Sequence, residues 1–204
     1  MALVEYFEAE KLLKRSGIRS VESAYVRNAG AAVAFAGGQG IVLKAVSRLA
    51  LHKSKSGLVM AGLRTPEDIT KAYNLLEKRA APYKPYRILA QKMVKGGVEI
   101  IIGGNEDAQF GKMILLGLGG IYVEAFRDFA LRVCPISMDD AVSMVRQLRS
   151  KKVIAPDAAD ERMIAELLLK ASRMYRNSNV KELDLNPVIL HDGTYDAVDI
   201  RMIR

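Results

Sequence analysis

The sequence is poor in the residues that mark extracellular, membrane-bound or disulfide-stapled proteins. It has no tryptophan and a single cysteine, Cys134, which excludes an internal disulfide. No apolar run is long enough to span a membrane, and the acidic residues Glu5 and Glu8 stand where a signal peptide needs a basic start. We therefore expect a cytoplasmic protein with no membrane partner, in which Cys134 is a small core residue.

Familiar binding motifs are also missing. The sequence contains no Walker A motif, no Gly-x-Gly-x-x-Gly after a strand pattern, no zinc-ligand spacing and no RNA-binding signature. The net charge of +8 admits nucleic acid, membrane surfaces or phosphorylated small molecules as partners. Lysine and arginine are scattered, however, and aromatic residues make up only 6% of the chain. We expect no nucleic-acid partner, and a basic nucleic-acid binder is the least favoured hypothesis.

Helical and strand-like hydrophobic patterns are mixed along the chain, without a strict strand–helix–strand repeat. The mixture predicts an α+β (mixed α/β) fold with two lobes in a single domain spanning 1–204. A proline-rich segment at 82–85 is the best boundary, which gives a small lobe at about 20–86 and a larger lobe at about 87–204. We expect helices near 3–16, 65–81, 137 onward and 160–175, and strands near 41–46, 58–63, 88–93, 98–102, 113–118 and 131–134.

The C-terminal region predicts a β-hairpin with an oxygen-rich face. Residues 182–190 and 195–201 alternate polar and apolar side chains around an Asp-Gly turn at 191–194. A period of two puts Asp184 and Asn186 on one face of the first strand, and the second strand brings Asp199. Mg²⁺ prefers such hard oxygen ligands, completed by phosphate. The alternative is a half-buried hairpin whose acidic face is merely solvated.

Lys44 stands alone in an otherwise apolar strand pattern at 41–46. Desolvating an ammonium is costly unless an anion pairs with it, and a phosphate is one such anion. The alternative is a lysine at an exposed strand end.

The polar loop at 51–57 follows, and it contains Lys53, Ser54 and Gly57. Positive charge, hydroxyl groups and free backbone N–H groups suit a phosphate-binding loop. His52 in the same loop has the chemistry of a general acid or base, or of a phosphoryl acceptor. The alternative for His52 is an ordinary surface residue.

A glycine-containing segment joins two expected strands at residues 91–99. It would suit an adenine pocket, with Met93 as an apolar wall and Glu99 reaching the ribose. The alternative is a simple hairpin connection.

Taken in order, these segments resemble the β subunit of an ADP-forming acetate–CoA ligase, also called ADP-forming acetyl-CoA synthetase. That subunit is an ATP-grasp domain related to the β chain of succinyl-CoA synthetase, and the resemblance covers nearly the whole chain. The segments that carry it are Lys44, His52-Lys53-Ser54, Gly97-Val98-Glu99, Gln109-Phe110-Gly111, Gly117 to Glu124, Arg132 to Pro135, and Glu182 to Pro187.

The resemblance implies a two-lobed ATP-grasp fold whose C-terminal hairpin holds Mg²⁺. It implies an enzyme that catalyses acyl-CoA + ADP + phosphate ⇌ acid + CoA + ATP. The β chain would pass a phosphoryl group between a phosphohistidine and ADP or ATP, and a CoA-binding α subunit would be its partner, in an α2β2 assembly. The implied nucleotide residues are Lys44, Lys53, Ser54, Gly57, Gln91, Lys92, Met93, Val94, Glu99 and Arg132; the metal residues are Asp184, Asn186 and Asp199; His52 is the implied catalytic relay.

Several positions depart from that family's pattern. Lys92 stands where an acid usually follows the hinge glutamine, and Lys112 replaces the proline that usually follows Phe-Gly. The segment 149–159 is shorter than in that family. Ile200 changes the usual Asp-Ala-Arg to Asp-Ile-Arg. These departures leave open an alternative, a non-catalytic ATP-grasp-like chain that stabilises or regulates an α subunit.

Overall fold

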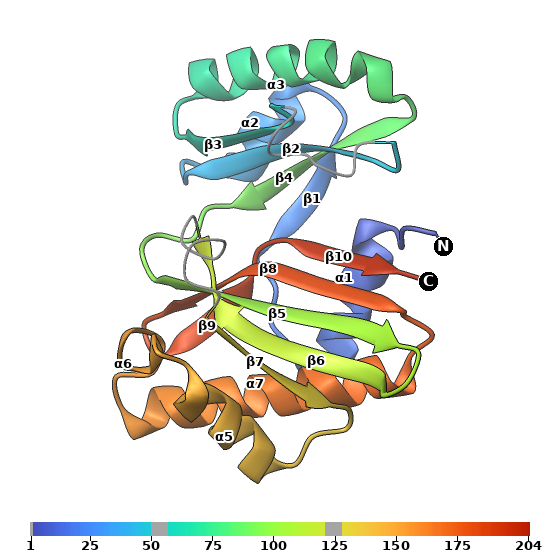
Figure 1. Cartoon of the computed structure of the whole chain (residues 1–204). Helices are drawn as coiled ribbons and strands as arrows, with labels where there is room; N and C mark the ends of the chain where they lie inside the picture. Colours follow the sequence, from blue (N-terminus) through green and yellow to red (C-terminus); the bar gives the residue numbers. More distant parts are fainter. Residues whose placement is uncertain (1, 50–56, 121–127) are drawn as a thin grey trace. The chain divides into compact units, whose positions relative to one another are not determined.

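The computed structural model describes residues 2–49, 57–120 and 128–204, and they form two compact units (Figure 1). Residues 21–95 make the small unit, and residues 1–20 with 96–204 make the large unit. Each unit has its own β-sheet and its own helices, so the expected mixed α/β architecture is confirmed. No described helix is long and apolar enough to cross a membrane.

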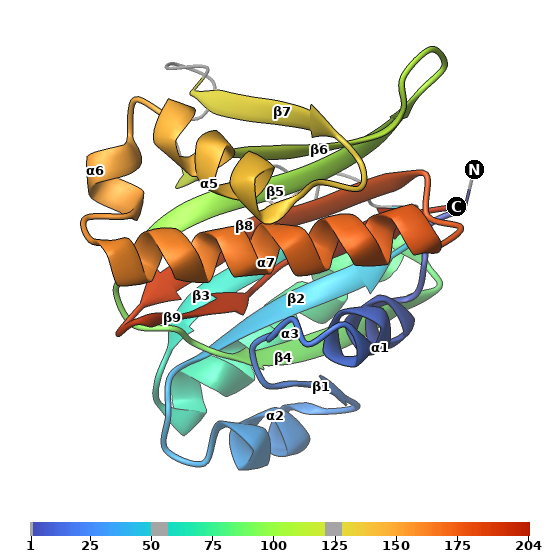
Figure 2. The same cartoon turned by 90° about the horizontal axis from the view of Figure 1, so that it is seen from below.

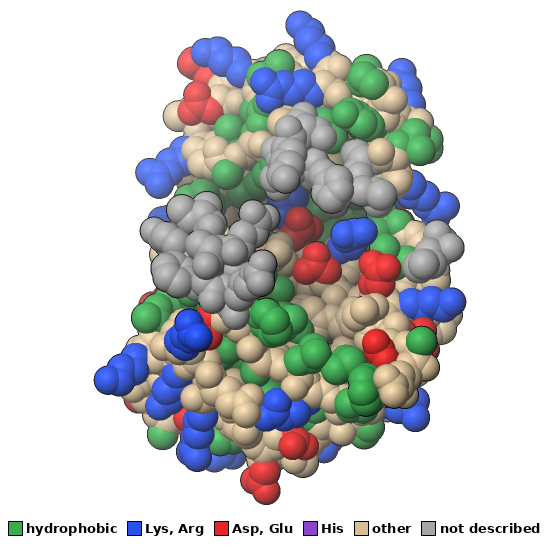
Figure 3. All heavy atoms as spheres, in the orientation of Figure 1, with side chains coloured by type: hydrophobic (Ala, Val, Ile, Leu, Met, Phe, Trp, Pro, Cys, Tyr) green, Lys and Arg blue, Asp and Glu red, His purple; other side chains and the backbone are tan. Residues whose placement is uncertain are grey.

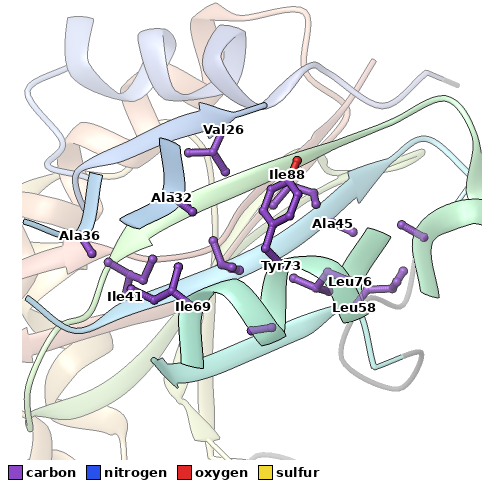
Figure 4. Packing of buried hydrophobic residues seen from close by; sticks show 14 residues of the cluster. Val26, Ala32, Ala36, Ile41, Ala45, Leu58, Ile69, Tyr73, Leu76 and Ile88 are labelled. Carbon is purple, nitrogen blue, oxygen red and sulfur yellow. The ribbon is translucent and has the colours of Figure 1, made fainter. Parts of the chain in front are cut away.

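The small unit is a four-stranded antiparallel sheet in the order β1-β4-β2-β3. Its strands are β1 (Ser23–Val26), β2 (Ile41–Ser47), β3 (Val59–Leu63) and β4 (Tyr86–Lys92). Two helices, α2 (Ala29–Ala36) and α3 (Pro66–Ala80), pack on it, and the short 3-10 turn η1 (Ala81–Tyr83) follows α3. Figure 4 shows Tyr73 and Leu76 of α3 among apolar side chains of the strands, so the amphipathic face of α3 closes this core.

The small unit extends beyond the boundary near residue 86 that the proline-rich segment suggests. The segment forms η1 and the entry to β4, and β4 then pairs along its whole length with β2. Because β4 is also the partner of β1, it is an internal strand of the small sheet. The unit therefore ends at Lys95.

The large unit contains a six-stranded antiparallel sheet in the order β10-β8-β5-β6-β7, with β9 paired to one end of β8. One face is covered by helices, of which α5 and α7 are seen in Figure 2. The strands are β5 (Val98–Asp107), β6 (Gly111–Leu118), β7 (Phe129–Val133), β8 (Glu182–His191), β9 (Thr194–Ala197) and β10 (Ile200–Ile203). The helices are α1 (Tyr6–Arg15), α5 (Met138–Gln147), α6 (Lys151–Ile154) and α7 (Ala158–Asn177).

Helix α5 begins where the sequence indicates. Ser137 and Asp140 form a reciprocal capping box, with the Ser137 hydroxyl accepting the Asp140 N–H and the Asp140 carboxylate accepting the Ser137 N–H. Asp157 caps the N-terminus of α7, since its carboxylate accepts hydrogen bonds from N–H groups of the first turn. The short helix α6 is not expected from the sequence, because its single turn has too little periodicity to detect.

An ion-pair cluster joins α5, α6 and α7. The Arg146 guanidinium donates to both carboxylate oxygens of Glu161 at 2.8–3.1 Å, and the Lys151 ammonium lies 3.7 Å from the same carboxylate. Hydrogen bonding from Arg146 lowers the pKa of Glu161 below its usual range.

A carboxyl whose pKa is lower in the folded protein stabilises the fold above its unfolded pKa and stops doing so as the pH falls through its folded pKa. We therefore expect wild-type stability to fall more between pH 6 and pH 3 than the stability of Glu161→Gln, which has no proton to gain there. Urea unfolding at both pH values measures this difference. Equal losses in the two proteins would contradict the assigned role of Glu161.

Candidate functional site

Lys44 lies in an internal strand of the small sheet, on the face opposite its core neighbours Leu43 and Ala45. It sits in the middle of β2, opposite Leu89 of β4 on one side and Val59 of β3 on the other, and it is only 6% exposed. The alternative of a lysine at an exposed strand end is therefore wrong. Burial of a lysine side chain favours pairing of its charge with an anion, and a phosphate remains one candidate for that anion.

The expected hinge, residues 91–94, begins with the last two residues of β4, and its first groups are already hydrogen-bonded within the small unit. The Gln91 side chain is fully buried and donates to the Ser23 hydroxyl at 3.1 Å. The Lys92 N–H donates to the Glu22 carbonyl and the Met93 N–H to the Gly40 carbonyl, both at 2.9 Å.

The end of the hinge is more accessible to a ligand. Met93 and Val94 are half-buried, and no described residue accepts a hydrogen bond from the Val94 N–H. Strands β4 and β5 belong to different sheets, so the segment is not the simple hairpin connection left open above.

The predicted metal residues meet at a β-bulge in the large unit. Asn186 and Pro187 of β8 lie opposite the single residue Ile101 of β5, where the strand register shifts. The chain between β9 and β10 pairs with this bulge: the Asn186 N–H donates to the Asp199 carbonyl at 3.2 Å, and the Val198 N–H donates to the Pro187 carbonyl at 3.0 Å. The expected hairpin is confirmed, but its second strand breaks at Val198–Asp199, and the break brings Asp199 to Asn186.

Asp184 completes this cluster. It lies opposite Arg201 in the register of β8 with β10, and it is two residues before the bulge. Burial raises the pKa of Asp184, Arg201 opposes the shift, and the negative charge of Asp199 adds to it. A bound cation would oppose this shift by favouring the charged form of Asp184.

The donor chemistry fits Mg²⁺ bound together with a phosphate. No three His, Cys, Asp or Glu side chains of the described residues are grouped to hold a metal by themselves. The cluster instead offers two carboxylates and one amide oxygen, and Mg²⁺ commonly takes few protein ligands and completes its shell with water and phosphate oxygens. The Nε of Arg201 is buried and donates to no described residue, which leaves a cationic donor beside Asp184.

Glu99 is exposed near the start of β5 and is contacted by glycines. The Gly119 N–H donates to the Glu99 carbonyl at 2.7 Å, and a Cβ on Gly119 would lie 2.8 Å from the Glu99 backbone. A Cβ on Gly120 would lie 3.2 Å from the Glu99 carboxylate. Gly119 and Gly120 therefore allow close packing around Glu99, a role that a glycine-rich sequence alone does not reveal.

Arg132 does not join the metal residues. Its guanidinium donates to the Leu131 carbonyl at 2.8 Å and reaches Ser143 of α5 at 3.4 Å. It pairs in register with the buried Ile114, so it shares the helix-covered face of the sheet, whereas Asp184 shares the opposite face with Gly103. The structure thus gives Arg132 a place different from the phosphate contact that the sequence suggests.

The open face of the large sheet combines the acidic cluster with an apolar surface. Phe129, Leu131 and Val133 of β7 are 53%, 40% and 46% exposed, and register through β6 and β5 places Leu131 on the same face as Asp184. In Figure 3 hydrophobic side chains gather on the viewed face of the large unit, with Asp and Glu side chains beside them. An apolar surface next to charged residues is typical of a surface that binds a partner.

The sequence of residues 2–203 matches the model of the family described as ATP-grasp domain. The chain is an ATP-grasp protein. It is similar to the β subunits of two ADP-forming acetate–CoA ligases of Pyrococcus furiosus, which confirms the resemblance described above. Form I is 33% identical, over 96% of this chain and 89% of the relative, and form II is 35% identical, over 99% and 91%. A longer ADP-forming acetate–CoA ligase of Archaeoglobus fulgidus is 36% identical over 96% of this chain and 30% of its own length.

Solved structures agree with this assignment. The dinucleotide-forming acetyl-coenzyme A synthetase 1 of Ca. Korarchaeum cryptofilum, in complex with coenzyme A, Ca-AMPCP and HgCl⁺, superposes with a TM-score of 0.89 at 34% identity, covering 99% of this chain and 93% of that one. A second structure of that protein has a TM-score of 0.84 at 34% identity, covering 99% and 92%. It contains coenzyme A and Mg-AMPPCP, with its phosphohistidine segment pointing towards the nucleotide binding site.

In this ATP-grasp chain the unusual Lys92 caps a helix. Its ammonium donates to the carbonyls of Phe35 and Ala36, at 2.7 and 2.9 Å, and lies 5.0 Å from the centre of the Phe35 ring. These carbonyls end α2, so a cation there also complements the helix dipole. Lys92 therefore anchors the hinge to α2, and the structure supports this role in place of a direct nucleotide contact.

We expect Lys92→Met to lower the free energy of unfolding by about 1–2 kcal/mol, because two charge-assisted hydrogen bonds are lost while the stem still packs. Lys92→Arg, which keeps the charge, should lose less. Urea unfolding of the three proteins measures the difference. A Met variant as stable as the wild type would show that the cap contributes nothing.

Lys112, the second unusual lysine of this ATP-grasp chain, acts in the same way. Its ammonium donates to the carbonyls of Tyr175 and Ser178 at the end of α7, at 2.8 and 2.6 Å, and lies 4.8 Å from the centre of the Tyr175 ring. Burial lowers the pKa of Lys112, and Glu106 opposes that shift. Both departures from the family pattern thus have structural uses outside the metal cluster.

The phosphate loop is described only at its end. His52, Lys53 and Ser54 lie outside the described residues. Gly57 is half-buried, with a φ of +64° and a carbonyl that accepts a hydrogen bond from Arg79 at 3.1 Å. This left-handed conformation favours glycine at position 57.

Proposed function

We propose that this chain is the nucleotide-binding β subunit of an ADP-forming acyl-CoA synthetase, acting as one ATP-grasp domain in the cytoplasm. Its reaction would be acyl-CoA + ADP + phosphate ⇌ acid + CoA + ATP, completed with an α subunit. The observation that carries the proposal is the cluster of Asp184, Asn186 and Asp199 at the β8 bulge. The high-coverage similarity to ADP-forming acetate–CoA ligase β subunits supports it.

Asp184, Asn186 and Asp199 would hold Mg²⁺ through two carboxylates and one amide oxygen. When bound, the ion would neutralise charge on the nucleotide phosphates. Asn186 and Asp199 are fixed to each other by the backbone hydrogen bond at the bulge, so their side chains need little reorganisation on binding.

The chain's own cations would stabilise the transferring phosphoryl group. In the ATP-forming direction the P–N bond of a phosphohistidine breaks and a P–O bond to the terminal phosphate of ADP forms. Such transfers depend on positioning and charge stabilisation more than on covalent chemistry. Arg201, which lies opposite Asp184, is a described cation proposed for this role. Lys44 is proposed to contact the nucleotide phosphates, and His52 is proposed as the relay.

The hinge would bind the edge of the adenine base through backbone groups after Met93. The N–H groups of Lys92 and Met93 are engaged within the small unit, so Val94 supplies the donor that we propose for the base. Met93 would provide an apolar wall, and Glu99 would bind the ribose.

A CoA-binding α subunit is the proposed partner, in an α2β2 assembly. The Pyrococcus relatives are named as β subunits, and the Archaeoglobus relative is much longer than this chain. We propose that the α subunit contacts the apolar residues Phe129, Leu131 and Val133, because they lie on the sheet face that also presents Asp184. A chain that receives a phosphoryl group from a partner must admit that partner next to its metal residues.

We expect Leu131→Asp to weaken binding of the α subunit at least tenfold, because a charge would be buried in an apolar contact, while the affinity for Mg-ADP changes less than twofold. Val153→Asp changes another apolar side chain, 58% exposed on α6, and serves as the matched control. Analytical ultracentrifugation and titration with ADP measure the two effects. Equal weakening by both variants would remove β7 as the docking surface.

The direct test of the proposed activity is a single turnover with a phosphorylated α subunit. Mixing it with this chain, ADP and Mg²⁺ should produce ATP and consume the phosphohistidine in equal amounts. The alternative, a non-catalytic partner, predicts a stable complex and no ATP.

A further inference from the structure

The large unit contains a cavity that shares no residue with the metal cluster. It lies where the C-terminal ends of α1 and α7 come together, two helices that are in contact and seen in Figure 2, and its volume is about 600 Å³. The residues lining it are Leu12, Arg15, Ser16, Lys170, Arg173, Met174, Asn177, Ser178 and Asn179.

The lining is cationic and has no compensating acid. It contains Arg15, Lys170 and Arg173, and it includes no carboxylate. None of these three forms an ion pair with another residue of 2–49, 57–120 or 128–204. Elsewhere on the same helices, Lys14 is paired with Glu10 and Arg162 with Glu166, both at 2.9 Å.

Helix capping does not account for these cations. Basic residues gather at helix ends because they complement the last carbonyl groups. Here the carbonyls of Tyr175 and Ser178 accept from Lys112, which is not in the lining, and the Leu12 carbonyl accepts from the N–H and the hydroxyl of Ser16. These carbonyls are thus satisfied by groups other than the three cations, and none of the described carbonyls at the two helix ends accepts a hydrogen bond from Arg15, Lys170 or Arg173.

We propose that this cavity binds a multivalent phosphate anion. Two guanidinium groups and one ammonium suit several phosphate oxygens, since arginine binds phosphate bidentately and lysine adds a point charge. The side-chain amides of Asn177 and Asn179 supply further donors. Leu12 and Met174 give the cavity an apolar wall, and its volume lies within the range of small-molecule sites, so an organic phosphate fits as well as an inorganic one.

The test is isothermal titration without divalent metal, in EDTA, using inorganic tripolyphosphate and fructose 1,6-bisphosphate as probes. All variants are made in the Asn186→Ala/Asp199→Ala protein, in which the proposed nucleotide site is disabled. Loss of probe binding then reports on the cavity and not on the proposed nucleotide site. Arg15→Gln/Arg173→Gln removes two lining charges. Arg162→Gln/Arg176→Gln removes two charges from α7 outside the lining and is the matched control.

We expect at least one probe to bind, with a Kd that rises tenfold or more in Arg15→Gln/Arg173→Gln and less than twofold in the control. Tighter binding of tripolyphosphate would indicate an inorganic ligand, and tighter binding of fructose 1,6-bisphosphate would indicate an organic phosphate. Equal weakening in the two double variants would show general attraction to a basic protein, and this result would overturn the proposal. Absence of binding by both probes would overturn it too.

Discussion

Asn186→Ala and Asp199→Ala should each weaken Mg²⁺-dependent binding of ADP about a hundredfold, which corresponds to about 2.7 kcal/mol. Each substitution removes one of the oxygen ligands proposed for the metal, and the remaining cluster has too few to hold it with the phosphates. Binding measured in EDTA should change much less, because that fraction rests on the hinge and on Lys44. A fluorescent ADP analogue titrated with and without Mg²⁺ separates the two components.

The matched control is Asp192→Asn, which removes an exposed charge at the turn of the same hairpin. Asp192 has a φ of +47°, a conformation that asparagine tolerates, so the turn should be preserved. Its Mg²⁺-dependent affinity should stay within twofold of wild type. If the control loses as much affinity as Asn186→Ala, the effect is general electrostatics and the bulge is not the metal site.

Gly97→Ala should destabilise the protein by roughly 3 kcal/mol, lowering Tm by roughly 6–12 °C. Gly97 has a φ of +103°, and a Cβ there would lie 2.4 Å from the Leu190 carbonyl oxygen and 2.7 Å from the Ile189 side chain. Both contacts are with β8, the strand that pairs with β5 immediately after this glycine. The methyl group would therefore force the two central strands of the large sheet apart near Glu99.

The neighbouring glycine provides the control for backbone strain alone. Gly96 has a φ of +66°, and no atom lies within 4 Å of a Cβ built on it. Gly96→Ala should thus cost only the left-handed backbone penalty of about 1–2 kcal/mol. Differential scanning calorimetry of both variants checks the comparison, and equal Tm values would mean that the close approach to Leu190 does not constrain the sheet.

Local signals in the sequence are sufficient for most of the elements. The Thr65-Pro66 start of α3, the capping box at Ser137 and the Asp-Gly turn of the C-terminal hairpin each depend on neighbouring residues. The structure confirms the helices expected near 65–81 and from 137 onward, and it confirms the hairpin turn. The positions of Asp184 and Asn186 on one strand also follow from the period of two.

Long-range pairing is what the sequence does not specify. Lys92 and Lys112 reach carbonyls 57 and 63 residues away, so their roles as helix caps have no local signature. The place of β4 inside the small sheet depends on β1 and β2, which lie much earlier in the chain.

The orientation of β7 cannot be predicted from the sequence, for a different reason. Phe129, Leu131 and Val133 are apolar but exposed, whereas Arg132 points to α5. Hydrophobic patterning assigns apolar residues to the interior, so it suggests the reverse orientation and puts Arg132 on the open face. An apolar surface kept exposed for a partner is a case in which this rule fails.

The most direct measurement is isothermal titration of the wild-type protein with ADP, first with Mg²⁺ and then in EDTA. The proposed site predicts one ADP per chain, bound at least tenfold more tightly when Mg²⁺ is present. ADP binding of equal strength with and without Mg²⁺ would contradict a metal-assisted nucleotide site at Asp184, Asn186 and Asp199.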